Sequence, residues 1–185
     1  METVSIDELL LGVEKDIENR QIWAQLLANK FADSVDTQSI DSSIVIKALP
    51  IITEALLKEK DNSTKNTLLI ALSNCSVSDS NSEDICKFLI KNDTIREQFN
   101  RLIELFTAHN PQAEVVTSTD SDEDYWLNCD PLQHLASVLC NLCQNTTGRD
   151  YAVKYYLKDI IPQVYCLILP VLYRNITTNH SHHIT

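Results

Sequence analysis

Three segments of the chain share a pattern in which an apolar helical run leads into an asparagine. The three asparagines are Asn29, Asn74 and Asn141. The step from Asn29 to Asn74 is 45 residues, and units of two or three helices that recur every ~40–47 residues build elongated helical stacks. The step from Asn74 to Asn141 is 67 residues, which falls to about one unit when a polar insertion at 108–128 is set aside. The spacing therefore predicts a chain of stacked helical units.

Glycine is scarce, because the 185 residues include only Gly12 and Gly148. Tight turns between β-strands need positive φ angles, which glycine adopts most readily. Two glycines are too few for a sandwich or barrel of this length, so the sequence predicts an all-α fold. Together with the spacing, this favours a right-handed α-solenoid of the armadillo or HEAT type. We expect about three to four repeats in one domain that spans residues 1–174.

The formal net charge of −11 and the isoelectric point near 4.7 argue against binding to nucleic acid or to an anionic membrane. The chain opens with acidic residues rather than with the basic and apolar regions of a signal peptide. The longest apolar run, at 160–173, is too short to cross a bilayer and contains Pro162 and Pro170. We therefore expect a cytoplasmic protein whose partner is another protein. Because the chain is acidic, a basic partner would complement its charge.

Residues that favour helix starts precede most of the apolar helical stripes. Ser5 and Glu8 form a capping box that opens the first helix. Asp41 or Ser42 can cap a helix that contains Pro50, which should kink or split it. Further helices are expected to start at Ser63 or Thr64, at Ser80 with Glu83, at Thr94 with Glu97, at Asp130 with Pro131, at Arg149 and at Ile161. An apolar stripe predicts one more core face, formed by Ile22, Trp23, Leu26, Leu27 and Phe31.

Two segments lack helical periodicity. The insertion at 108–128 contains a run of hydroxyl and acidic side chains, without an apolar residue, at 117–124. We expect this insertion to form an acidic loop. Residues 175–185 are mostly polar and follow the last apolar run, so we expect them to form a disordered tail.

Cys140 and Cys143 form a C-x-x-C pair, whose spacing places both sulfurs on one face of a helix. Such a pair can serve redox chemistry or zinc binding. A structural zinc needs four ligands, however, and His134 is a weak third candidate. Cysteines within apolar helical runs act as small hydrophobic residues, so packing is the favoured role for this pair.

The acids Asp120, Asp122 and Asp124 resemble the start of an EF-hand calcium loop. That loop needs a glycine at its sixth position and a glutamate at its twelfth, where this chain has Tyr125 and Pro131. Calcium binding is therefore rejected. The two glycines also leave no phosphate-binding loop, and no serine–histidine–aspartate arrangement can be placed. We expect no metal site, no cofactor and no catalytic residue.

The recurring asparagines Asn29, Asn74 and Asn141 could play either of two roles near the end of a helix. They could donate hydrogen bonds to the backbone of the neighbouring unit, which would hold the stack together. They could instead face a groove and bind the main chain of an extended peptide. Both roles stay open, with the first one favoured.

Residues 132–156 carry a more specific pattern. It contains Leu135-Ala136-Ser137-Val138, then Asn141-Leu142-Cys143-Gln144, and then Gly148-Arg149. This pattern resembles the eukaryotic armadillo-like family whose members act as cytosolic chaperones for the folding of translation elongation factor two, alongside the ring chaperonin. The resemblance covers residues 65–157. Cys143 stands where the family has serine or threonine, and family members continue through further repeats, so the resemblance implies a shortened or diverged member.

The resemblance implies a non-enzymatic folding cofactor for elongation factor two that holds a segment of its client on a groove. The cytosolic chaperonin is then a second partner. The candidate partner-binding residues are Asn29, Asn74, Asn141 and Arg149. A generic armadillo-type adaptor or scaffold is the alternative, and a thiol- or zinc-dependent enzyme is a more remote one. The apolar positions at 160–173 surround much of their helix, which predicts self-association or a partner at that end.

Overall fold

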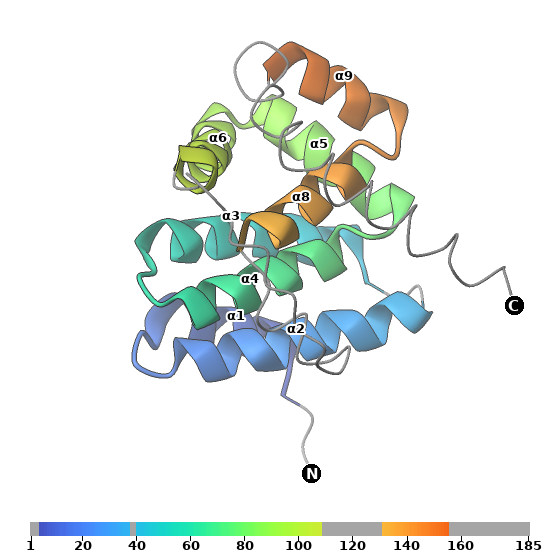
Figure 1. Cartoon of the computed structure of the whole chain (residues 1–185). Coiled ribbons are helices and arrows are strands. Elements are labelled where there is room, and N and C mark those ends of the chain that lie inside the picture. Colours follow the sequence, from blue (N-terminus) through green and yellow to red (C-terminus); the bar gives the residue numbers. More distant parts are fainter. Residues whose placement is uncertain (1–3, 38–39, 109–130, 156–185) are drawn as a thin grey trace, which may run out of the picture.

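The computed structural model of the chain describes residues 4–37, 40–108 and 131–155 (Figure 1). These residues form eight helices and no strand, which confirms the all-α prediction. The first four helices are α1 (Ile6–Lys15), α2 (Arg20–Thr37), α3 (Ser42–Lys58) and α4 (Asn62–Cys75). The others are α5 (Asp79–Lys91), α6 (Asp93–Ala108), α8 (Pro131–Leu142) and α9 (Thr146–Tyr155). The predicted acidic loop beyond Ala108, the apolar run at 160–173 and the tail at 175–185 lie outside the described residues.

Three of the predicted helix starts are confirmed, those of α1, α3 and α8, and α8 begins at Pro131 as predicted. The backbone N–H of Glu8 donates to the Ser5 hydroxyl at 3.2 Å, and the Glu8 carboxylate accepts from the Ser5 backbone N–H at 2.8 Å. The Asp41 carboxylate accepts from the backbone of the first turn of α3 and caps that helix. Pro50 does not split α3, which runs unbroken from Ser42 to Lys58. Buried residues on both sides of the proline hold the two halves of α3 against the same core: Val45, Ala48, Leu49, Ile52 and Leu56.

Four other helices begin earlier than the sequence predicted. The Asp61 carboxylate caps α4 by accepting from the Thr64 backbone N–H at 2.7 Å, and the Ser78 hydroxyl caps α5 by accepting from the Asn81 backbone N–H at 3.2 Å. α6 begins one residue before Thr94, and α9 begins three residues before Arg149. Where several polar residues compete for a cap, the first one with an extended backbone takes it, and later ones lie inside the helix.

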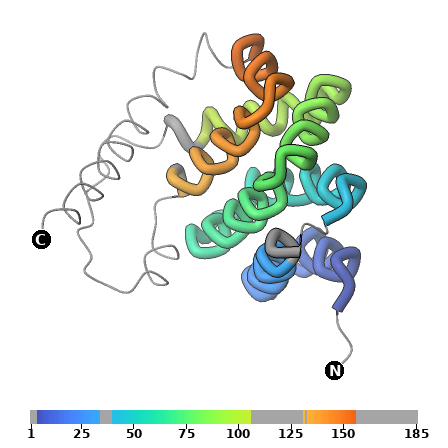
Figure 2. The backbone as a smooth tube through the Cα atoms, turned by 90° about the vertical axis from the view of Figure 1, so that its right-hand side faces the viewer, coloured from blue at the N-terminus to red at the C-terminus, as the bar shows by residue number. Residues whose placement is uncertain are grey.

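The helices form two layers, which Figure 2 shows on opposite sides of the molecule. α2, α4 and α8 pack side by side in one layer and lie one above another in Figure 1. α1, α3 and α5 form the other layer, in which α6 packs against α3 and α9 packs against α5. The core lies between the layers, and each helix contributes one buried stripe to it. Its large, fully buried side chains include Phe31, Leu49, Leu68, Leu72, Ile85, Phe99 and Tyr151.

Both glycines of the chain lie inside helices rather than in turns. A Cβ atom on Gly12 would lie 2.3 Å from the indole ring of Trp23, and one on Gly148 would lie 1.5 Å from the backbone carbonyl oxygen of Leu142. Neither distance is compatible with a side chain. The glycines therefore allow α2 to approach α1 and the end of α8 to approach α9.

We expect Gly148→Ala to lower the free energy of unfolding by about 1–3 kcal/mol, the usual range for forcing extra atoms into a packed contact. The new methyl group would meet the Leu142 carbonyl, which belongs to the backbone and can move only with the turn between α8 and α9. Urea denaturation measures the loss. Val153→Ala is the control, because Val153 is 58% exposed on the same helix. Equal stability of the two variants would contradict the expected clash.

Candidate functional site

Polar bonds join α2 and α4 at two levels. The side-chain amide of Gln21, at the start of α2, donates to the Thr67 hydroxyl of α4 at 3.2 Å. The side-chain amide of Asn74, at the end of α4, donates to the backbone carbonyl of Ala28, in the middle of α2, at 3.2 Å. Because the later residue of α4 meets the later residue of α2, the two helices run in the same direction.

A bond of the same kind, from an asparagine side chain to a backbone carbonyl, joins α8 to α4. The side-chain amide of Asn141 donates to the backbone carbonyl of Ser73 at 3.2 Å and to the Ser76 hydroxyl at 3.1 Å. We call the two bonds, from Asn74 to Ala28 and from Asn141 to Ser73, the asparagine ladder. Of the two roles that the sequence left open, Asn74 and Asn141 therefore perform the first, since both bind the backbone of the preceding helix in the layer.

Asn29 is not part of the asparagine ladder. Its side chain is exposed and accepts a hydrogen bond from Gln25 of the same helix at 3.0 Å. The asparagines of α4 and α8 directly precede the buried residues Cys75 and Leu142, whereas the residue directly before the buried Phe31 of α2 is Lys30. The sequence pattern was thus one residue out of register in α2. One residue turns a helix by about 100°, which is why Asn29 faces solvent.

The predicted core stripe of α2 was also partly wrong. Ile22 and Leu26 are 58% and 42% exposed, whereas Leu27 and Phe31 are fully buried. Ile22, Leu26 and Asn29 follow one another at a helical spacing of four and three residues, so they share the side of α2 that faces away from the core. The alignment of two aliphatic residues with a polar one was the signal that could have identified this stripe as exposed.

A second set of polar bonds links the starts of α3, α5 and α9. The Ser42 hydroxyl of α3 contacts the Asn81 side-chain oxygen at 3.4 Å. The side-chain amide of Asn145 donates to the Ser82 hydroxyl at 2.8 Å, and its oxygen accepts from the Gly148 backbone N–H at 2.7 Å. Short turns connect the end of α4 to α5 and the end of α8 to α9. These bonds therefore lie along the same edge of the molecule as the asparagine ladder.

Arg149 lies in the first turns of α9 and binds back onto the end of α8. Its guanidinium donates to the backbone carbonyls of Cys143 at 3.3 Å and Gln144 at 2.8 Å, and to the Thr146 hydroxyl at 3.1 Å. The last carbonyls of a helix lack partners within it and carry partial negative charge, which a cation stabilises. Arg149 thus closes the end of α8, and binding of a partner by this residue stays a prediction.

Two further arginines close helix ends in the same way. Arg20 donates to the backbone carbonyl of Val13 at 3.0 Å, near the end of α1. Arg96 donates to the carbonyls of Leu89 and Ile90 at the end of α5. Its guanidinium also lies 4.7 Å from the centre of the Tyr155 ring, within the range of a cation–π interaction.

Arg20 also forms an ion pair that is almost fully buried. Its guanidinium lies 3.0 Å from the Glu59 carboxylate, and the two side chains are 6% and 13% exposed. Burial acts to raise the pKa of Glu59. Hydrogen bonds from the Asp61 backbone N–H, the Arg20 guanidinium and the Lys60 backbone N–H outweigh this effect and leave the pKa below its usual value. The Glu59 carboxylate therefore links the corner between α1 and α2 to the turn after α3.

The cysteines of the described residues are free thiols, of which Cys75 and Cys86 are buried, Cys143 is half-buried and Cys140 is exposed. Burial raises the pKa of Cys75 and of Cys86 to about 12, and it raises the pKa of Cys140 and Cys143 as well. Redox reactions and zinc binding use the thiolate, which these surroundings disfavour at neutral pH. Within the described ranges, no three His, Cys, Asp or Glu side chains are grouped closely enough to hold a metal ion. The packing role predicted for the C-x-x-C pair fits the half-buried Cys143 better than the exposed Cys140.

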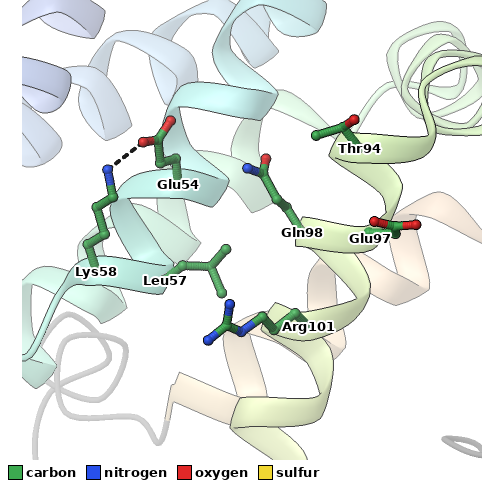
Figure 3. Close-up of a pocket in the computed structure, with 7 residues that line it drawn as sticks. All are labelled: Glu54, Leu57, Lys58, Thr94, Glu97, Gln98 and Arg101. Atoms are coloured by element: carbon green, nitrogen blue, oxygen red, sulfur yellow. Dashed lines mark hydrogen bonds and ion pairs between the residues drawn. The ribbon is translucent and has the colours of Figure 1, made fainter.

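A cleft of about 480 Å³ lies between α3 and α6, and its lining is Glu54, Leu57, Lys58, Thr94, Glu97, Gln98 and Arg101. Glu54 and Lys58 form an ion pair on α3, and Gln98 points from α6 toward them (Figure 3). The two acids and two bases of the lining cancel in charge, and most of these side chains lie at the surface. The cleft therefore favours no particular class of ligand.

Charged side chains are distributed unevenly between the helices. α5 and α6 carry five each, whereas α4 and α8 carry one between them, Lys65. α2 carries none from Gln21 to Asn29. The outer side of α4, α8 and the first half of α2 is therefore poor in charge, and Lys30 and the exposed Asp33 follow on the second half of α2. We call this charge-poor side the uncharged face and define it by six exposed or half-buried residues: Ile22, Leu26, Asn29, Ile70, Ser73 and Cys140.

Comparisons of the chain with protein-family models, with curated proteins and with solved structures find no match. Among the described residues, no helix combines the length and the apolar character that crossing a membrane requires.

We expect Asn141→Ala to lower the free energy of unfolding by about 1–2 kcal/mol, because the half-buried Ser73 carbonyl and the buried Ser76 hydroxyl would each lose one hydrogen bond. Thermal and urea denaturation measure the change. Asn29→Ala is the matched control and should change stability by less than about 0.5 kcal/mol, since Asn29 is exposed and bonds only within α2. A larger loss from the control than from Asn141→Ala would show that the ladder does not hold α8 in place.

The buried ion pair predicts how stability depends on pH. A carboxylate whose pKa is lower in the folded chain stabilises the fold above its unfolded pKa, near 4.5 for Glu59, and that contribution is lost as the pH falls through the folded pKa. Glu59→Gln should therefore be less stable than the parent at pH 7 and should lose less stability on acidification below 4.5.

Melting temperatures measured between pH 7 and pH 3 check this expectation. Asp7→Asn is the control, because it breaks an exposed ion pair with Lys47, which is worth only about 0–1 kcal/mol. Parallel curves for Glu59→Gln and the parent would contradict the assignment of the pH dependence to Glu59.

Proposed function

We propose that this chain is a non-enzymatic protein-binding module, built as a right-handed armadillo-like α-solenoid whose uncharged face holds a segment of a client protein. The uncharged face is the observation that carries the proposal. It spans three helices of a chain whose net charge is −11. An acidic protein that keeps α4, α8 and the first half of α2 poor in charge has a surface suited to contact rather than to solvation.

The solenoid arrangement is supported by repetition in space. α1 with α2, α3 with α4, and α5 and α6 with α8 make three successive units. The asparagine ladder joins each unit to the next through equivalent side chains, Asn74 and Asn141. Stacks of this kind bury apolar surface between neighbouring units and leave one continuous face for binding.

The client that we propose is translation elongation factor two, with the cytosolic chaperonin as a second partner and the cytoplasm as the site of action. The support is the resemblance of residues 132–156 to the chaperone family described above. Arg149, which that pattern includes, closes the end of α8. A generic armadillo-type adaptor, which would use the same face for a different client, is the second candidate.

Affinity purification from eukaryotic cytosol tests the client. We expect elongation factor two and chaperonin subunits to be enriched on the tagged chain, as quantified by mass spectrometry. The control bait is an unrelated helical protein of similar net charge, which accounts for basic proteins that bind to any acidic surface. Enrichment of another protein, with neither expected partner, would favour the adaptor, and equal recovery on both baits would refute the client assignment.

A further inference from the structure

We infer that the outer face of α1 pairs with the same face of a second copy of the chain, with the two helices antiparallel across a twofold axis beside Leu11. We call this surface, formed by Glu8, Leu11 and Lys15, the α1 face. The inference goes beyond the proposed function and does not depend on it, because α1 belongs to the layer opposite the uncharged face.

The α1 face lies on the side of α1 that points away from the core. The buried side chains of α1 are Leu9, Leu10 and Val13. In contrast, Leu11 is 56% exposed, and Glu8 and Lys15 are exposed as well. These three follow one another at intervals of three and four residues, so their side chains form one row along the helix. α1 lies at one end of its layer, beside α3 (Figure 1), which leaves this row accessible to another molecule.

The charges of the α1 face are placed so that the face complements itself. With a rise of 1.5 Å per residue, Glu8 lies about 4.5 Å before Leu11 along the helix axis and Lys15 lies about 6 Å after it. When two such helices pack antiparallel with Leu11 against Leu11, each Glu8 therefore lies opposite the Lys15 of the other copy. A twofold interface repeats every contact, which gives two ion pairs around one apolar centre. A parallel pairing would instead place like charges opposite each other.

Both charged groups of the α1 face can form a further interaction. In the capping box, Oε2 of Glu8 accepts from the Ser5 backbone N–H and from the Ser5 hydroxyl, both at 2.8 Å. Within the described residues, no donor contacts Oε1 of Glu8. Lys15 pairs with Glu14 at 2.6 Å, but its side chain is 67% exposed, and an ammonium group has three donors. Each group can therefore bind a second copy without losing the partner that it has.

Exposed apolar side chains flank the α1 face at both ends. Val4 lies just before the helix and is 44% exposed, and Ile17 lies just beyond it and is 70% exposed. In an antiparallel pair the start of one helix meets the end of the other, so Val4 of one copy comes beside Ile17 of the other. The order along the surface is apolar, acidic, apolar, basic and apolar. Reversal of that order matches apolar groups with apolar groups and acids with bases, so the α1 face suits a second copy of the same chain.

The size of the α1 face limits the strength of the pairing. α1 has 10 residues, and stable interfaces bury ~1,200–2,000 Å², which is more than one short helix provides. The net charge of −11 on each copy also opposes association. We therefore expect a weak dimer with a Kd on the order of 10–100 µM, as is typical of small interfaces.

Sedimentation velocity of the full chain, at concentrations that bracket the expected Kd, tests the pairing. We expect the parent to dimerise and Lys15→Glu to weaken the dimer by about tenfold or more, because carboxylates then face each other on both sides of the axis. Lys91→Glu is the matched control, since it makes the same change in net charge at an exposed residue of α5. A monomeric parent, or equal association of the parent and Lys15→Glu, would overturn the inference.

Mixing two charge variants tests the antiparallel geometry. Glu8→Lys and Lys15→Glu each place like charges opposite one another in a pair of identical chains, so neither should dimerise alone. In a mixed pair every acid faces a base again, and an equimolar mixture should therefore dimerise with about the affinity of the parent. If Glu8→Lys fails to fold because it loses the capping box, Leu11→Asp and Leu11→Lys replace the two variants, since their charges meet at the axis. A mixture that stays monomeric would refute the geometry.

The same measurements separate the α1 face from other sites of association. If the parent associates and every α1 variant associates equally, the contact lies elsewhere in the chain and the inference fails. The proposed function is tested apart from this, because Lys15→Glu leaves the uncharged face unchanged. We expect Lys15→Glu to recover the same client as the parent in the affinity purification. Loss of the client from both chains would refute the proposed function and leave the dimer in place.

Discussion

The arrangement of the helices depends on side-chain amides that reach from one helix to the backbone of the next. The asparagine ladder donates from α4 to the Ala28 carbonyl of α2 and from α8 to the Ser73 carbonyl of α4, so each bond crosses between neighbouring helices of the layer. The bond from Asn145 to Ser82 continues the same edge in the other layer. Apolar packing alone would allow neighbouring helices to slide, because it is non-directional. The directed bonds set the register, and the core of each layer then fits against the other.

The use of uncharged hydrogen bonds to fix the helices is consistent with the different content of charged residues in the two layers. Once the helix ends are joined by uncharged amides and hydroxyls, α4 and α8 need no ion pairs to stay in place, and they carry one charged residue between them. The other layer carries most of the charged residues of the described helices, together with exposed pairs such as Lys87 with Glu83. The few charges of the α2, α4 and α8 layer lie mainly on α2.

Much of the fold could be predicted from the sequence, and the errors have a common physical origin. The scarcity of glycine identified an all-α chain, and the close contacts of Gly12 and Gly148 explain why a side chain would not fit at either position. Asn74 and Asn141 were recognised because an apolar helical run leads into each of them. Asn29 was misplaced because a short motif does not specify the rotation of its helix to within 100°, and that rotation is set by tertiary contacts such as Trp23 against Gly12. The helix starts were misplaced where several hydroxyl and acidic residues compete for one cap.

The rotation of α2 about its axis also determines which of its apolar side chains are exposed. The number of apolar residues in the helix does not give this information. Ile22 and Leu26 are apolar residues in a helical stripe, and by composition they are indistinguishable from Leu27 and Phe31. The contact between α1 and α2 turns the first pair toward solvent and the second pair into the core. The exposure of Ile22 and Leu26 is therefore a consequence of how α2 is held, by the contact of Trp23 with Gly12 on one side and by the bond from Asn74 to Ala28 on the other. A change in either contact would rotate α2 and with it the side chains of Ile22 and Leu26. The contacts that hold the helices together therefore also determine which side chains are exposed.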